Sequence, residues 1–169
     1  LERNWIIALN SDDQGQLWFG QGWIGGGVTR FNPKTREETT FMRAQGLPDD
    51  WVGAIERKPD GGVWIGTGAG LALYRYGQIE NVGERLRIQS GAVWNLRRDA
   101  EGTLWIGGAT GLHRLKGNNL VSLTATNEVP IEGVRCSART ADGIIWVCTD
   151  KNGLLRYDGE AVTIIDKRD

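Results

Sequence analysis

The stretch Gly61-Gly62-Val63-Trp64-Ile65-Gly66 decides the fold, because the 169-residue chain contains four versions of it. The other three read GQLWFG, GTLWIG and GIIWVC, at residues 15–20, 102–107 and 143–148. A glycine followed by an apolar residue comes shortly after each version, at residues 27–28, 70–71, 111–112 and 153–154. This regular spacing indicates an array of similar structural units, each about 40 residues long. The tryptophans in register, for which we predict a structural role between units, are Trp18, Trp64, Trp105 and Trp146.

Each unit predicts four short strands. In the third unit these are residues 92–98, 103–107, 112–115 and 120–124, and glycine-containing turns such as 99–102 separate them. No segment has the periodicity of a long helix. A repeated four-stranded unit of this length is typical of a β-propeller blade. We therefore predict an all-β fold, a single propeller segment over 1–169 made of four antiparallel blades. The predicted blades span approximately 4–44, 50–85, 91–126 and 132–166.

The composition fits this fold and excludes several others. The chain has 25 glycines and 8 tryptophans but only 4 prolines, which is unlike collagen or a disordered linker. A net charge of −1 argues against a surface that binds nucleic acid through phosphate contacts. No apolar run is long enough to span a bilayer, and no N-terminal signal peptide is visible. We expect no nucleic-acid partner and no membrane insertion by this segment.

The repeat also resembles a known family. The run Asp60 to Thr67, continued by Gly70-Leu71, is similar to the two-component-regulator propeller repeat of bacterial hybrid histidine kinases and diguanylate cyclases. Residues 45–50 (QGLPDD) resemble the linker that precedes each blade in that family. The resemblance implies a periplasmic or extracellular sensor region with a role in signalling. That family usually joins many more blades and adds a membrane anchor or signalling domain, neither of which this sequence shows. Virginiamycin B lyase, a propeller enzyme, has a similar repeat.

Four blades leave the closure of the propeller open. The chain could close alone as a small ring, two chains could pair into an eight-bladed ring, or the chain could be an excerpt of a longer array. An open arc would expose faces rich in tryptophan, isoleucine and valine at both ends. Self-association through the end blades is therefore an expected partnership.

The two cysteines are predicted to face each other in the last blade. The first hairpin of that blade turns around Asp142, so residues whose numbers add to 284 should pair, as Cys136 and Cys148 do. Cys148 takes the place of the glycine in the Trp-x-Gly motif. Two alternatives follow, a disulfide or two buried apolar thiols. The equivalent pairs in the other blades are Ala8 and Gly20, Ala54 and Gly66, and Asn95 and Gly107.

Catalytic and cofactor signatures are missing. His113 is the single histidine, and the cysteines lack Cys-x-x-Cys spacing, so we predict no metal site and no cofactor. We expect His113 at the surface of the third strand of its blade. The run Gly25-Gly26-Gly27 lacks the Lys-Ser/Thr of a phosphate-binding loop. The sequence does not single out a pair of carboxylates for general acid–base catalysis, so we predict no catalytic residue and no enzyme activity.

Candidate ligand-binding residues follow from the propeller architecture that the resemblance implies. In such a fold the first strand of each blade lines the axis, and the loops at its beginning form the usual ligand face. Aromatic residues there suit a carbohydrate or another small ligand. For Trp5 and Trp51 the alternative is packing at the axis. The candidates are Trp5, Trp51 and Trp94 near the starts of inner strands, Trp23 in the longest loop, and Asp50, Glu132 and Arg135.

Three functions compete. The first is a non-enzymatic binding or sensor segment that recognises a glycan or other small ligand at the central face. The second is a structural blade array that assembles through its end blades. The third is a propeller lyase or glycosidase, which would need a clustered acid and base that the sequence does not show.

Overall fold

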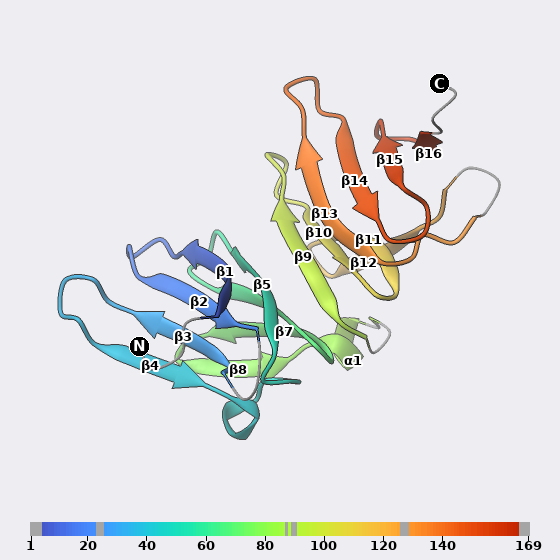
Figure 1. Ribbon diagram of the computed structural model, residues 1–169. Coiled ribbons are helices and arrows are strands. Elements are labelled where there is room, and N and C mark those ends of the chain that lie inside the picture. The colour runs from blue at the N-terminus through green and yellow to red at the C-terminus, as the bar shows by residue number, and fades with distance from the viewer. Residues whose placement is uncertain (1–4, 23–25, 87, 89–90, 126–128, 166–169) are drawn as a thin grey trace.

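The computed structural model describes residues 5–22, 26–86, 88, 91–125 and 129–165, and it confirms the all-β fold with four separate four-stranded antiparallel sheets (Figure 1). We call the sheets blades one to four. Blade one contains β1 (Ile6–Ser11), β2 (Leu17–Gln21), β3 (Val28–Phe31) and β4 (Glu38–Phe41). Blade two contains β5 (Val52–Arg57), β6 (Val63–Thr67), β7 (Gly70–Arg75) and β8 (Gln78–Asn81). Blade three contains β9 (Val93–Arg98), β10 (Leu104–Gly108), β11 (Gly111–Lys116) and β12 (Asn119–Leu123). Blade four contains β13 (Val134–Arg139), β14 (Ile145–Thr149), β15 (Leu154–Tyr157) and β16 (Val162–Ile165).

Within each blade the strands follow one another in chain order, so every blade is a meander. The described parts of the connections between blades contain two single-turn helices, the 3-10 turn η1 (Arg43–Gln45) and α1 (Gly83–Leu86). In the first connection Gly46 has a φ of 105° and Leu47 is buried in the core between blades one and two. A non-glycine residue rarely adopts that φ. The Gly-Leu pair of the linker therefore turns the chain and inserts an apolar side chain between the two blades.

The register of the first hairpin in each blade is the predicted one. Cys136 pairs with Cys148, and the equivalent pairs in the other three blades are those expected from the repeat. The structure joins the two cysteines in a disulfide, with their Cα atoms 5.2 Å apart. Cys136 is exposed and Cys148 half-buried, so the alternative of two buried thiols is wrong. Both cysteines lie in blade four, at one end of the arc.

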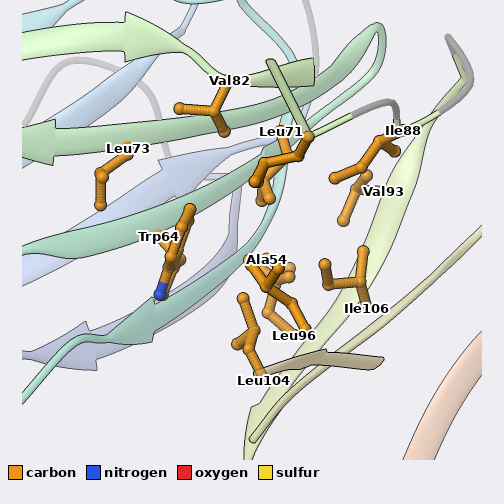
Figure 2. Packing of buried hydrophobic residues seen from close by; sticks show 12 residues of the cluster. Ala54, Trp64, Leu71, Leu73, Val82, Ile88, Val93, Leu96, Leu104 and Ile106 are labelled. Carbon is orange, nitrogen blue, oxygen red and sulfur yellow. The ribbon is translucent and has the colours of Figure 1, made fainter. Parts of the chain in front are cut away.

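Three apolar clusters hold neighbouring blades together, one at each interface between successive blades. Figure 2 shows the cluster between blades two and three, where Trp64 and Leu71 lie opposite Val93, Leu96 and Ile106. Trp18 and Trp105 are buried in the equivalent clusters, whereas Trp146 on blade four is half-buried.

Trp18 and Trp105 are also held by the turn before them. The Trp18 indole N–H donates to the Asp12 carboxylate at 2.9 Å, and the Trp105 indole N–H donates to Asp99 at 2.8 Å. The same aspartates accept backbone N–H groups of their own turns. These two aspartates therefore order their own turns and also orient the tryptophans that follow.

The four blades form an open arc. Figure 1 shows blade one, in blue, and blade four, in red, at opposite ends of the molecule. The inner strands contact one another in the order β1, β5, β9, β13. The small closed ring, one of the three alternatives for closure, is therefore not what this chain forms.

Candidate functional site

Each inner strand contains a β-bulge near its beginning. The pairing of the first two strands slips by one residue at the same place in every blade. A bulge leaves one residue unpaired and turns its side chain away from the regular alternation. We call these four positions the bulge row, and they hold Ile7, Gly53, Trp94 and Arg135.

Two predicted site residues meet in the bulge row. The Arg135 guanidinium carbon lies 3.7 Å from the centre of the Trp94 ring, in cation–π geometry. Arg135 also binds both carboxylate oxygens of Asp150, at 2.9 and 2.8 Å from its Nε. This hydrogen bond raises the pKa of Arg135 and lowers that of Asp150 from their usual values. The result is an aromatic–cation–carboxylate group on neighbouring blades three and four, with Trp94 half-buried and the charged pair exposed.

On blade two the bulge residue is Gly53, and Trp51 lies against it. A Cβ atom added to Gly53 would collide with the six-membered ring of the Trp51 indole. The Trp51 backbone N–H donates to Asp49 Oδ1 at 2.9 Å, which fixes the start of the inner strand. The Trp51 side chain is half-buried. Glycine at this bulge therefore allows the indole to lie against the inner strand.

The two predicted carboxylates have structural partners. Asp50 Oδ1 accepts the backbone N–H of Arg43 at 2.7 Å, and its carbonyl oxygen accepts the N–H of Gly27. Glu132 forms an ion pair with Lys151. Both carboxylates therefore hold loops at the beginning of inner strands.

The remaining two candidates are in blade one. Trp5 is 62% exposed, so for Trp5 the alternative of a side chain packed at the axis is wrong. Its carbonyl oxygen accepts the backbone N–H of Gly22 at 3.1 Å, which ties the chain before β1 to the loop after β2. Trp23 lies outside the described residues.

Sequence reasoning missed two clefts at the opposite edge of the blades, where the turns between first and second strands lie. One, of about 450 Å³, opens between blades three and four and includes Asp99, Arg114 and Arg139 in its lining. The other, of about 330 Å³, opens between blades two and three. Their linings come from strands of different blades. The sequence could have indicated these clefts only through the basic residues that stand at or next to the ends of several strands. The basic residues that line the second cleft are Lys58, Arg75, Arg85 and Arg98.

His113 does not lie at the surface as predicted. Its side chain is 6% exposed, with Nδ1 2.9 Å from the Ser122 hydroxyl and Nε2 3.4 Å from that of Thr110. Burial lowers the pKa of His113. The prediction failed because the blade before it covers this face of blade three.

Buried His113 predicts a loss of stability in mild acid. The unfolded chain binds a proton near the ordinary histidine pKa of about 6.5, whereas the folded chain binds it only at lower pH. Unfolding thus takes up a proton, and the free energy of unfolding falls as the pH drops below about 6.5. We expect the wild type to lose more stability between about pH 7.5 and 5.5 than His113→Asn, measured by urea unfolding at both pH values. An equal loss in both proteins would contradict this assignment.

Two further findings concern the described part of the chain. No group of three or more His, Cys, Asp or Glu side chains within it is placed to hold a metal ion. Among the same residues, no helix has the length and apolar character needed to cross a membrane.

The family comparison agrees with the geometry of blade two. A model of the two-component regulator propeller matches residues 46–69, which run from the linker glycine through β5 and β6. This chain carries a two-component-regulator propeller repeat. The matched segment includes Gly46, which turns the chain, and Leu47, which is buried between blades one and two. It also includes the Trp64-Ile65-Gly66 motif, whose tryptophan packs between blades two and three.

Solved structures with similar folds come from longer chains. The extracellular domain of a protein from B. thetaiotaomicron, described as a hybrid two-component system, has a TM-score of 0.75 and 22% identity, over 99% of this chain and 23% of that one. A second such domain from the same organism has a TM-score of 0.64 and 19% identity, over 95% and 29%. Virginiamycin B lyase from Staphylococcus aureus has a TM-score of 0.72 and 16% identity, over 94% and 54%.

These similarities establish the propeller fold. The chain spans about a quarter of the length of the two sensor domains from B. thetaiotaomicron. The comparison with curated proteins found no match to this chain.

Proposed function

We propose that this chain is a non-enzymatic binding segment of an extracellular sensor propeller, and that its ligand contacts the bulge row. The observation that carries the proposal is the bulge itself, which displays Trp94 and Arg135 side by side on neighbouring blades. Bulges are frequent next to functional sites because they redirect side chains. The sensor context comes from the matched repeat and from the B. thetaiotaomicron extracellular domains with the same fold.

A carbohydrate is the ligand class that this surface fits best. Half-buried indoles offer apolar faces and edges to the C–H groups of a sugar ring. The exposed Arg135 and Asp150 offer a hydrogen-bond donor and an acceptor to hydroxyl groups at the same place. Trp51, at the start of the neighbouring inner strand β5, provides a second aromatic side chain at the same edge of the array.

Binding rather than catalysis is supported by what the acidic groups of this surface contact. Asp150 is engaged with Arg135, Glu132 with Lys151, and Asp50 with a backbone N–H. The Arg135 hydrogen bond lowers the pKa of Asp150, which disfavours a protonated carboxyl that could act as a general acid. His113, the single histidine, is buried between strand neighbours away from the bulge row.

The test uses a panel of neutral oligosaccharides, built from glucose, xylose, mannose or galactose units, titrated into the wild type with tryptophan fluorescence and calorimetry. We expect at least one to bind, and Trp94→Ala to weaken it about fivefold or more, as expected from losing an aromatic contact of roughly 1 kcal/mol. Trp51→Ala should weaken binding in the same direction.

The matched control is Tyr76→Asn. Tyr76 is 87% exposed but lies in the turn between β7 and β8, at the opposite edge of the blade. Its φ of 52° suits asparagine, so the substitution keeps the turn. If no oligosaccharide of the panel binds, the carbohydrate proposal is overturned. If Tyr76→Asn weakens binding as much as Trp94→Ala does, the ligand does not occupy the bulge row.

The second function, a blade array that assembles with other blades, has its own support. The end blades expose apolar side chains, Leu9 on β1 and Leu154 on β15. Exposed apolar residues are typical of an interaction surface where they gather in a patch.

A further inference from the structure

The cleft between blades two and three differs in charge from the larger cleft between blades three and four. We call it the basic cleft, because the described part of its lining contains basic residues and no acidic one. These basic residues are Lys58, Arg75, Arg85 and Arg98. The larger cleft has carboxylates in its lining as well, those of Asp99 and Glu101. The basic cleft therefore lacks negative charges that an otherwise similar cleft carries.

The first missing carboxylate belongs to the turn after the inner strand. In blades one and three this turn begins with Asp12 or Asp99, which accepts the indole N–H of the tryptophan in the next strand. In blade two the same backbone hydrogen bond places Lys58 at this position. The indole N–H of Trp64 consequently makes no hydrogen bond with the described part of the chain, although Trp64 lines the cleft. Figure 2 shows the Trp64 nitrogen at the edge of the apolar cluster.

The second missing contact belongs to the arginine that ends the inner strand. Arg57 of blade two pairs with Asp13 of blade one, and Arg139 of blade four pairs with Glu101 of blade three. Arg98 of blade three is their equivalent by register. It makes no hydrogen bond or ion pair with the described residues, and its Nε is buried without a hydrogen-bond partner. A buried donor in this state is costly, so a ligand that accepts its hydrogen is favoured.

Acidic residues beside the lining do not replace the missing groups. They interact with its basic residues as follows: Glu56 electrostatically with Arg98, Asp60 in ion pairs with Lys58 and Arg75, and Glu80 in an ion pair with Arg85. Even so, the Nε of Arg75 is buried without a hydrogen-bond partner, like that of Arg98. The cleft thus keeps two guanidinium N–H groups and one indole N–H for an acceptor from outside the chain.

We propose that the basic cleft binds a small polyvalent oxyanion, which carries carboxylate or phosphate groups, between blades two and three. The anion takes the place of the carboxylate that the chain itself supplies in blades one and three. It accepts N–H groups of Arg98 and Trp64 and lies near the ammonium group of Lys58. Guanidinium groups match the oxygen spacing of carboxylates and phosphates. The cleft volume of about 330 Å³ is at the small end of the range for small-molecule sites, which fits a small anion.

The anion also connects two blades. Lys58 and Trp64 belong to blade two and Arg98 to blade three, so a bound anion holds the interface between them together. A ligand that binds only the folded chain raises its unfolding temperature. The basic cleft lies at the opposite edge of the blades from the bulge row, so this site is separate from the proposed carbohydrate surface.

The test titrates citrate and inorganic phosphate separately into the full chain, followed by calorimetry, tryptophan fluorescence and thermal unfolding. Sodium chloride at about 0.15 M screens attraction to exposed charges. We expect at least one anion to bind and to raise the unfolding temperature, and Arg98→Gln to weaken binding about tenfold through loss of a charge-assisted hydrogen bond. Binding of citrate alone identifies a carboxylate ligand, and binding of phosphate alone a phosphorylated one.

The matched control is Arg139→Gln. It makes the same substitution at the equivalent position of blade four, where the arginine already pairs with Glu101. This variant should bind the anion as the wild type does. An equal loss of affinity in Arg98→Gln and Arg139→Gln would show that the anion does not occupy the basic cleft.

A further variant, Lys58→Asp, supplies the carboxylate from the chain. The new side chain stands where the turn aspartates of blades one and three stand, so it can accept the Trp64 indole N–H and occupy the place of the anion. We expect Lys58→Asp to abolish anion binding, whereas Lys58→Gln, which only removes the charge, should retain weakened binding. Circular dichroism checks that every variant is folded. The proposal is overturned if neither anion binds the wild type with a Kd below about 10 mM, or if Lys58→Asp binds as well as Lys58→Gln.

Discussion

Gly20→Ala is expected to destabilise the chain by about 2–3 kcal/mol, although it adds only one methyl group. The added Cβ would meet a side chain and also the Val52 carbonyl oxygen, at 2.7 Å. A side chain can rotate away, but a backbone oxygen of the next inner strand moves only if the two blades separate. Val52 is fully buried, so its side chain has no room to retreat. Urea unfolding followed by tryptophan fluorescence measures the change.

The matched control is Gly83→Ala. A Cβ atom there would lie 3.3 Å from the Asn81 side-chain oxygen and 4.0 Å from the Ile88 carbonyl, which are tolerable contacts. Gly83 opens the short helix α1, where alanine is a better helix former than glycine. We expect a change within about 1 kcal/mol, in either direction. Equal destabilisation by the two substitutions would show that Gly20 is not a steric contact between blades.

The fold and the first hairpins were predictable because the chain repeats itself. Four aligned copies place each glycine and tryptophan in the same register, and a tight turn then fixes the pairing of the strands it joins. This is why the pairing of Cys136 with Cys148 followed from counting around Asp142. Their state did not follow in the same way, because burial of the cysteines depends on whether another blade covers blade four.

The candidate site was predictable in part. Trp94 and Arg135 were both predicted as candidates, but the contact between them depends on a bulge in both inner strands. A bulge is one extra residue in a strand pair, and hydrophobic alternation alone does not reveal it. The burial of His113 had a signal in the repeat that was not used. His113 is equivalent to Ala72, and a small apolar residue at that position indicates a covered sheet face.

The repeated tryptophans should not contribute equally, although the sequence presents them as equivalent. Trp105 is buried between blades three and four, with its ring centre 5.2 Å from that of Tyr157 and its indole N–H bonded to Asp99. Trp105→Ala removes these contacts and leaves a cavity between blades, so we expect it to cost about 3–5 kcal/mol. Trp146 stands at the same position of blade four, where it is only half-buried.

Trp146→Ala is therefore expected to cost about 1–2 kcal/mol, since less apolar area returns to water. The two variants compare an indole that the next blade covers and Asp99 binds with one that is only half-buried, so their difference under the same urea unfolding conditions measures what the covered position adds. Because domains of this size are stable by roughly 5–15 kcal/mol, Trp105→Ala should leave the chain close to unfolding at room temperature while Trp146→Ala remains folded. Similar costs for both would mean that Trp146 is as well covered in solution as Trp105 is.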